Sequence, residues 1–63
     1  MELDRAQLSS LATTLTDLTA RVVTMAEGYA ESPREDVAAD LFEVERSLQA
    51  ATRRLHALLE KVR

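Results

Sequence analysis

The sequence predicts an all-α fold, an antiparallel two-helix hairpin, from three observations. Two long segments carry apolar residues at alternating spacings of three and four, which is the pattern of a helical coiled coil. The only glycine and the only proline lie between these segments. A connection of about five residues joins neighbouring antiparallel helices. We therefore expect one domain over residues 1–63, with a helix over about 3–27, a turn over 28–32 and a second helix over about 33–62.

The first segment carries a heptad repeat with an apolar residue at every a and d position. With Leu8 taken as position a, the repeat consists of Leu8, Leu11, Leu15, Leu18, Val22 and Met25, and Tyr29 continues it at the turn. The e positions are all small, namely Ala12, Thr19 and Ala26. Small residues on that flank would let another helix approach closely.

The turn combines an end signal for one helix with a start signal for the next. Gly28 suits the left-handed position that follows a helix, because it has no Cβ to clash. Ser32 is expected to be the N-cap of the second helix, with Pro33 in its first turn. Glu35 would complete a capping box by reaching back to the Ser32 amide.

The second segment repeats the heptad pattern, and its apolar row consists of Val37, Leu41, Val44, Leu48, Ala51, Leu55, Leu58 and Val62. We expect the two rows to face each other about Ala30, which would place Leu18 near Leu41. The second helix would then extend beyond the first by one or two turns. Its apolar end, with Leu55, Leu58, Leu59 and Val62, would lack a full partner within the chain.

A chain of 63 residues buries too little surface to be comfortably stable alone, so something must supplement its core. The sequence contains no cysteine, which excludes disulfides and thiolate metal sites. Apolar residues beside the strict repeat widen each apolar row to the width that a bundle helix needs; these are Ala12, Ala26, Ala38, Phe42 and Leu59. We therefore expect a homodimeric four-helix bundle. The alternative is a different protein that takes the apolar end of the second helix into a groove.

Charge is unevenly distributed along the chain. Residues 27–45 contain seven acids and only Arg34, a net charge of −6, whereas residues 46–63 contain five bases and only Glu60, a net charge of +4. Within the second helix this order suits the helix dipole. It would also let two hairpins match unlike charges if they lay head to tail. The overall net charge of −3 and the pI near 5.0 argue against nucleic-acid binding.

The sequence offers little material for catalysis or metal binding. His56 and Glu60 are one helical turn apart, but one histidine and one carboxylate do not complete a metal site. The serines and threonines have no neighbouring base, and no glycine-rich phosphate loop occurs. We therefore expect a non-catalytic interaction or regulatory protein without metal or cofactor.

A second alternative is a sensor of small anions or nucleotides at a dimer cleft. Arg46, Arg53 and Arg54 are the basic residues that such a site would use, because the guanidinium fork binds oxyanions in a bidentate way. Phe42 and Leu59 lie off the strict repeat and would belong to a partner surface if exposed.

The sequence shows neither a secretory leader pattern nor an apolar run near 20 residues, so we expect a cytoplasmic protein that does not interact with membranes. The chain has seven arginines against one lysine, ten alanines, and no asparagine or isoleucine. This composition is typical of a GC-rich bacterial coding sequence.

Overall fold

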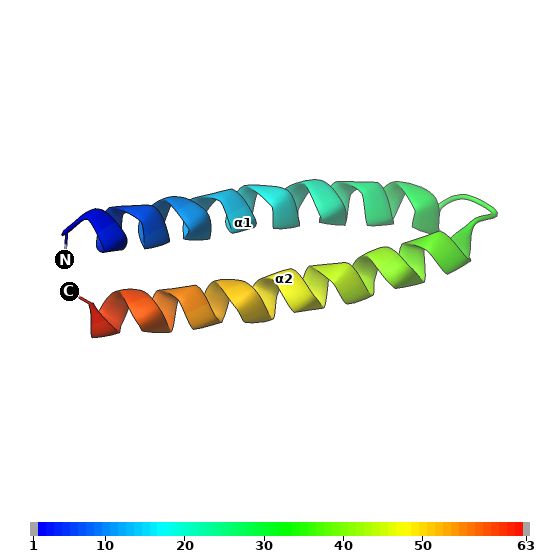
Figure 1. Ribbon diagram of the computed structural model, residues 1–63. Helices are drawn as coiled ribbons and strands as arrows, with labels where there is room; N and C mark the ends of the chain where they lie inside the picture. The colour runs from blue at the N-terminus through cyan, green and yellow to red at the C-terminus, as the bar shows by residue number, and fades with distance from the viewer. Residues whose placement is uncertain (1, 63) are drawn as a thin grey trace.

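The protein is an antiparallel hairpin of two α-helices, as the computed structural model shows for residues 2–62, with side chains described from residue 4 onward. Helix α1 spans Glu2–Ala30 and helix α2 spans Glu35–Lys61; the described residues contain no strand. The start of α1 and the end of α2 lie together, and the turn lies at the far end (Figure 1). The hairpin is 49 Å long and 14 Å wide. The prediction of an all-α two-helix hairpin is therefore confirmed.

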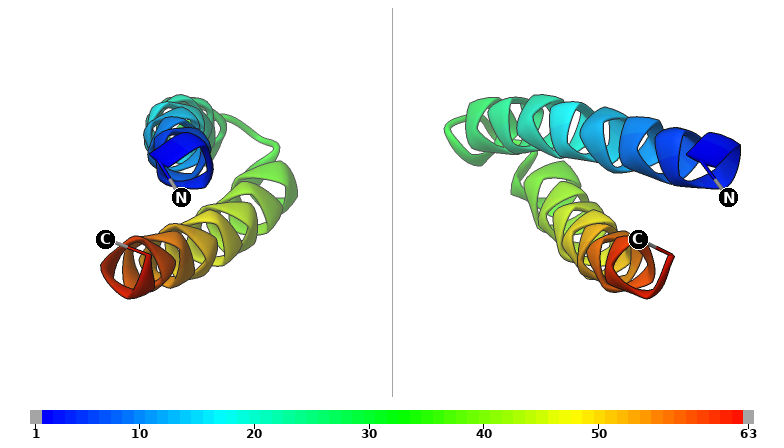
Figure 2. Two further views of the ribbon diagram at one scale, coloured as in Figure 1. Left: turned by 60° about the vertical axis from the view of Figure 1, so that its left-hand side comes forward. Right: turned by 90° about the vertical axis from the view of Figure 1, so that its left-hand side faces the viewer.

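The axes of the two helices are not parallel, as a view more nearly along the hairpin shows. Figure 2 shows that α2 is inclined to α1 as the two helices run away from the turn. Such an inclination accompanies the packing of side-chain ridges of one helix into the grooves of the other. The two helices therefore contact each other along one stripe of each, and the position of a residue in the heptad repeat determines whether it lies in that stripe or beside it.

Helix α1 continues through Gly28 and ends at Ala30, so the prediction that Gly28 terminates it in a left-handed conformation is wrong. The stop comes from Pro33, which has no N–H to donate to the carbonyl of Tyr29 one turn earlier. The Ser32 N–H and the Ser32 Oγ bind that carbonyl instead, at 3.0 and 2.7 Å. A residue that precedes proline is also disfavoured in the helical conformation, which ends α1 before Ser32.

Helix α2 begins two residues later than predicted. Its N-cap is Arg34, which makes no side-chain capping bond, so the predicted N-cap at Ser32 with Pro33 in the first turn is wrong. The Ser32 hydroxyl is engaged between the two helices, since it donates to Tyr29 and accepts from the Arg34 N–H at 3.1 Å. Glu35 and Asp36 instead occupy the first turn of α2, where negative charge suits the helix dipole.

The two helices are almost equal in length, and α2 does not overhang α1. The Arg5 Nη1 donates to the Leu59 carbonyl at 2.7 Å, which sets the first turns of α1 level with the last turns of α2. Arg5 and Leu59 are equidistant from Ser32 along the chain, so the pairing is centred there and not at Ala30. The longer α1, which extends to Ala30, moves the centre and removes the predicted overhang.

The contact between the helices uses a different stripe of α1 from the predicted one. The buried residues are all alanines: Ala12 and Ala26 of α1 and Ala38 of α2. Thr19 lies between the two α1 alanines, is half-buried, and donates its hydroxyl to the Leu15 carbonyl at 2.6 Å. We call Ala12, Thr19 and Ala26 the contact stripe. Because these side chains are small, the backbones approach closely and the larger d residues are left to one side.

Candidate functional site

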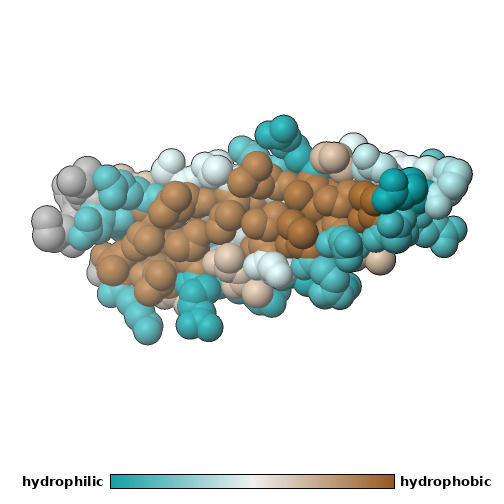
Figure 3. Space-filling view, turned by 45° about the vertical axis from the view of Figure 1, so that its right-hand side comes forward, coloured by the Kyte–Doolittle hydropathy of each residue, from teal (hydrophilic) through white to brown (hydrophobic). Residues whose placement is uncertain are grey.

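An apolar surface covers one long side of the hairpin. The d positions of α1 are exposed, with exposed fractions of 54% for Leu11 and Met25. On α2, Val44 is 45% exposed. We define the apolar face by its exposed members, Leu11, Leu18 and Met25 of α1 and Val44, Ala51 and Val62 of α2. Figure 3 shows that apolar side chains form one strip that runs across both helices on this side.

The apolar face follows from the packing of the contact stripe. Leu11 and Ala12 are neighbours in sequence and therefore point about 100° apart around the helix. When Ala12 turns toward α2, Leu11 is carried away from it. The same rotation of about 100° between neighbouring residues turns Leu18 away from α2 beside Thr19, and Met25 beside Ala26. The two heptad rows that were predicted to face each other therefore share one side of the molecule, and the half-buried residues Leu15, Leu48 and Leu55 lie between them.

The opposite long side carries a shallow groove whose exposed lining is mostly methyl and methylene groups. Its main part is lined by Thr16, Thr19, Ala20, Gln49, Thr52 and Arg53. The threonine hydroxyls donate to carbonyls of their own helices, as Thr16 does to Ala12 at 3.0 Å and Thr52 to Leu48 at 2.8 Å. Gln49 donates to the Glu45 carboxylate at 3.1 Å. The groove lining thus combines methyl groups, hydroxyls and an amide that are already hydrogen-bonded within their own helices, and the Arg53 guanidinium.

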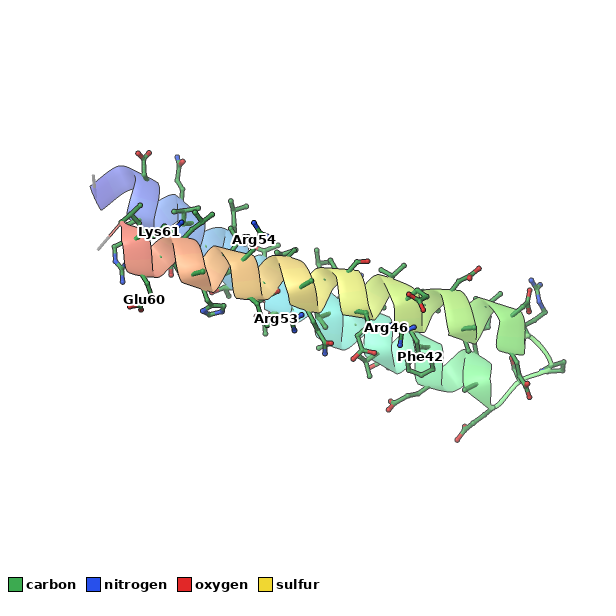
Figure 4. All side chains as sticks on the ribbon, turned by 90° about the horizontal axis from the view of Figure 1, so that it is seen from below. Phe42, Arg46, Arg53, Arg54, Glu60 and Lys61 are labelled. Atoms are coloured by element: carbon green, nitrogen blue, oxygen red, sulfur yellow. The ribbon has the colours of Figure 1, made fainter. Side chains whose placement is uncertain are left out.

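The three candidate arginines do not converge on one site. Arg46 forms an ion pair with Glu43 of its own helix, and Arg53 lines the groove. Figure 4 shows Arg54 on the opposite edge of α2 from Arg46 and Arg53. The structure therefore places Arg46 and Arg53 on one edge of α2 and separates Arg54 from them.

Phe42 and Leu59 are half-buried beside the helix contact and lie outside the apolar face. Phe42 lies on the same edge of α2 as Arg46 (Figure 4). Leu59 lines a smaller hollow near the open end with His56 and Asp17. Of the predicted partner surface, Phe42, Arg46 and Arg53 thus lie on one edge of α2 and Arg54 on the other, and the larger apolar surface lies elsewhere.

The described acidic residues are exposed, except for Glu45, which is half-buried. The Arg34 guanidinium binds Asp36 through two contacts of 3.1 Å, and this hydrogen bond lowers the pKa of the Asp36 carboxyl. In the part of the chain that the structure describes, no group of three or more histidine and acidic side chains could hold a metal ion. His56 is exposed beside the smaller hollow.

Two features of the structure were not anticipated from the sequence. Arg5 binds the Leu59 carbonyl near the C-terminal end of α2, where a positive charge is favourable. In the sequence, the only indication of this contact was a basic residue near the start of the first helix, beside the end of the second. The apolar face itself had a clearer signal. The small e residues indicated close approach on one flank, and a helix packed on that flank leaves the d row uncovered.

Neither helix of the described chain has a stretch long and apolar enough to cross a membrane. The candidate site is an exposed strip of leucine, valine and methionine side chains on one side of a helical hairpin, and the shallow groove lies on the other side. Comparison with protein-family models, curated proteins and solved structures finds no match to this chain.

Proposed function

We propose that this chain is a non-catalytic protein–protein interaction or regulatory protein, and that its first partner is a second copy of itself. Two hairpins would bury their apolar faces against each other and form a four-helix bundle. The observation that carries this proposal is the exposure of the d row on α1 beside the exposed valines of α2. Bundle helices place such rows in the core.

The large accessible surface area of the single hairpin supports this proposal. A compact monomer of 7.0 kDa would expose about 4,000 Å² by the usual scaling of surface with mass. The hairpin exposes 4820 Å², which is roughly 800 Å² more than that scaling gives. Each side of a standard protein–protein interface contributes about 800 Å². The excess accompanies the elongated shape of the hairpin, and it is of the size that one copy would bury in a dimer.

The core of the single hairpin gives the same indication. Among the described residues, the three buried ones are alanines, and no large side chain is fully buried. Each large aliphatic side chain contributes about 1.5–3 kcal/mol when it is fully buried. Leu11, Leu18 and Met25 would supply this stabilisation only when another surface covers them.

The test compares two neighbouring substitutions, Leu11→Glu and Ser10→Glu, on the purified chain. Leu11 lies in the apolar face, whereas Ser10 is exposed outside it. We expect the unmodified chain to sediment as a dimer and to lose helical circular dichroism as it dissociates on dilution. Leu11→Glu should weaken the dimer by roughly 100-fold or more, because it buries an unpaired carboxylate. Ser10→Glu should leave the dimer unchanged.

Three results would contradict the proposal. A monomer that keeps its helix on dilution would show that the hairpin needs no second copy. A monomer with little helix would show that the apolar face belongs against a different protein. Equal effects of the two substitutions would show that the dimer uses another surface.

A further inference from the structure

We infer that the second copy lies head to tail, so that the turn of each hairpin lies beside the open end of the other. This inference rests on the proposed dimer and adds its orientation. It follows from the distribution of charge along the hairpin and from the residues that border the apolar face on α2.

The two ends of the hairpin carry opposite charge. Around the turn, residues 27–45 have a net charge of −6. Their single base, Arg34, is already bound by Asp36. The other end of α2 carries Arg53, Arg54 and Lys61, and the nearby acids are Glu60 on the same helix and Asp4 in the first turn of α1. Asp40 in the acidic part of α2 and Arg54 in its basic part are fourteen residues apart, which is about 21 Å along the helix.

The two possible dimers differ in what meets at the turn. A two-fold axis along the hairpin places both acidic turns at the same end, with Arg21 the only base in the half of α1 beside them. Charges that are nearer than about 10 Å interact strongly at ordinary ionic strength, and more distant exposed charges are screened. The parallel dimer therefore gathers both acidic turns at one end of the molecule and both basic ends at the other. A two-fold axis across the hairpin brings unlike charges within range.

The edge of α2 beside the apolar face specifies the register. Asp40, Ser47, Arg54 and Lys61 follow one another at intervals of seven, so they lie on one edge. Figure 4 shows that Arg54 and Lys61 share this edge, opposite Arg46 and Arg53. In the head-to-tail dimer, α2 lies antiparallel to α2 of the second copy. With Ser47 at the axis, each Asp40 comes level with Arg54 of the other copy.

The same register gives the largest overlap of the apolar faces. Helix α2 spans Glu35–Lys61, so Ser47 is next to its central residue. An axis at Ser47 therefore superposes the full lengths of the two hairpins. Between residues 6 and 26, α1 carries only Asp17 and Arg21 as charged residues, so it does not oppose this arrangement. Charge pairing and apolar burial thus favour the same position of the second copy.

The orientation can be measured by energy transfer, because the chain has no natural cysteine. Single cysteines are introduced by Ala30→Cys beside the turn and by Ala6→Cys at the open end, where both alanines are exposed. Donor-labelled and acceptor-labelled samples are then mixed and allowed to exchange. We expect efficient transfer between a labelled turn and a labelled open end, and weak transfer between two labelled turns.

Charge exchange tests the register. Asp40→Arg and Arg54→Asp should each weaken the dimer roughly tenfold, because each change replaces two symmetry-related ion pairs by repulsions. The double variant should regain the original dissociation constant to within about twofold, since it restores both pairs with their signs reversed. Sedimentation of the same samples gives the mass.

The possible failures are distinguishable. A dimer with efficient transfer between two labelled turns would overturn the head-to-tail orientation and keep the proposed function. A dimer in which the double variant is as weak as the single ones would overturn the register. A labelled chain that sediments as a monomer would overturn both the orientation and the proposed function.

Discussion

Two neighbouring stripes of α1 differ in side-chain size and in what covers them. The contact stripe of Ala12, Thr19 and Ala26 is small and faces α2. The adjacent row of Leu11, Leu18 and Met25 is large and exposed. The chain thus has small residues at the contact within one hairpin and leaves the large residues of the neighbouring row exposed. Side-chain size separates the contacts within the hairpin from those that we propose between two hairpins.

The largest expected effect is at the contact stripe. Ala26 has an exposed fraction of 0%, so Ala26→Leu would add bulk where the two backbones approach closely. Overpacking of this kind costs about 1–3 kcal/mol. We expect a fall of that size in the free energy of unfolding, measured by urea denaturation at fixed protein concentration.

The matched control is the neighbouring substitution Met25→Leu. Met25 is 54% exposed, and the exchange of methionine for leucine conserves volume. We expect its cost to be well below that of Ala26→Leu. If the two variants lost equal stability, the contact stripe and the exposed row would not differ as the structure indicates.

The helices themselves were predictable because the 3-4 spacing specifies an amphipathic helix whatever it packs against. Which stripe faces α2 was not predictable from that spacing. The row through Leu11 and the row through Ala12 both recur at intervals of seven. The choice depends on how closely the backbones approach, which is a property of the pair of helices and not of either sequence pattern.

The end of α1 and the start of α2 could not be predicted from the sequence for a related reason. Ser32 lies between two helices, and its hydroxyl can bind groups of either one. The missing N–H of Pro33 leaves the Tyr29 carbonyl without its helical donor, and Ser32 satisfies it. The register centred at Ser32 removed the predicted overhang, whereas the apolar face follows from the contact stripe, which turns the row of Leu11, Leu18 and Met25 away from α2.

A smaller effect is expected at a position that contacts nothing. Gly28 lies within α1 at negative φ, and a Cβ built there meets no atom within 4 Å. Gly28→Ala should therefore stabilise the chain by about 0.8–1.0 kcal/mol, the difference in helix propensity between the two residues. Ala39→Gly, at an exposed position inside α2, should lower stability by a similar amount. Loss of stability in Gly28→Ala would instead mean that Gly28 adopts the left-handed conformation that the sequence predicted.

The smallest expected effect is at the exposed Arg34–Asp36 pair beside the turn. Arg34 holds the pKa of the Asp36 carboxyl below its usual value, so the folded chain binds this proton less readily than the unfolded chain does. The pair therefore stabilises the fold above the ordinary pKa of aspartate, and this contribution disappears as the pH falls through the lowered pKa. Titration of the Asp36 carboxyl carbon by NMR should show the lowered pKa and its return toward the ordinary value in Arg34→Gln. Because both side chains are exposed, solvent screens the pair, and its removal should shift the urea midpoint far less than Ala26→Leu does. A shift as large as that of Ala26→Leu would mean that the turn, and not the contact stripe, dominates the stability of the hairpin.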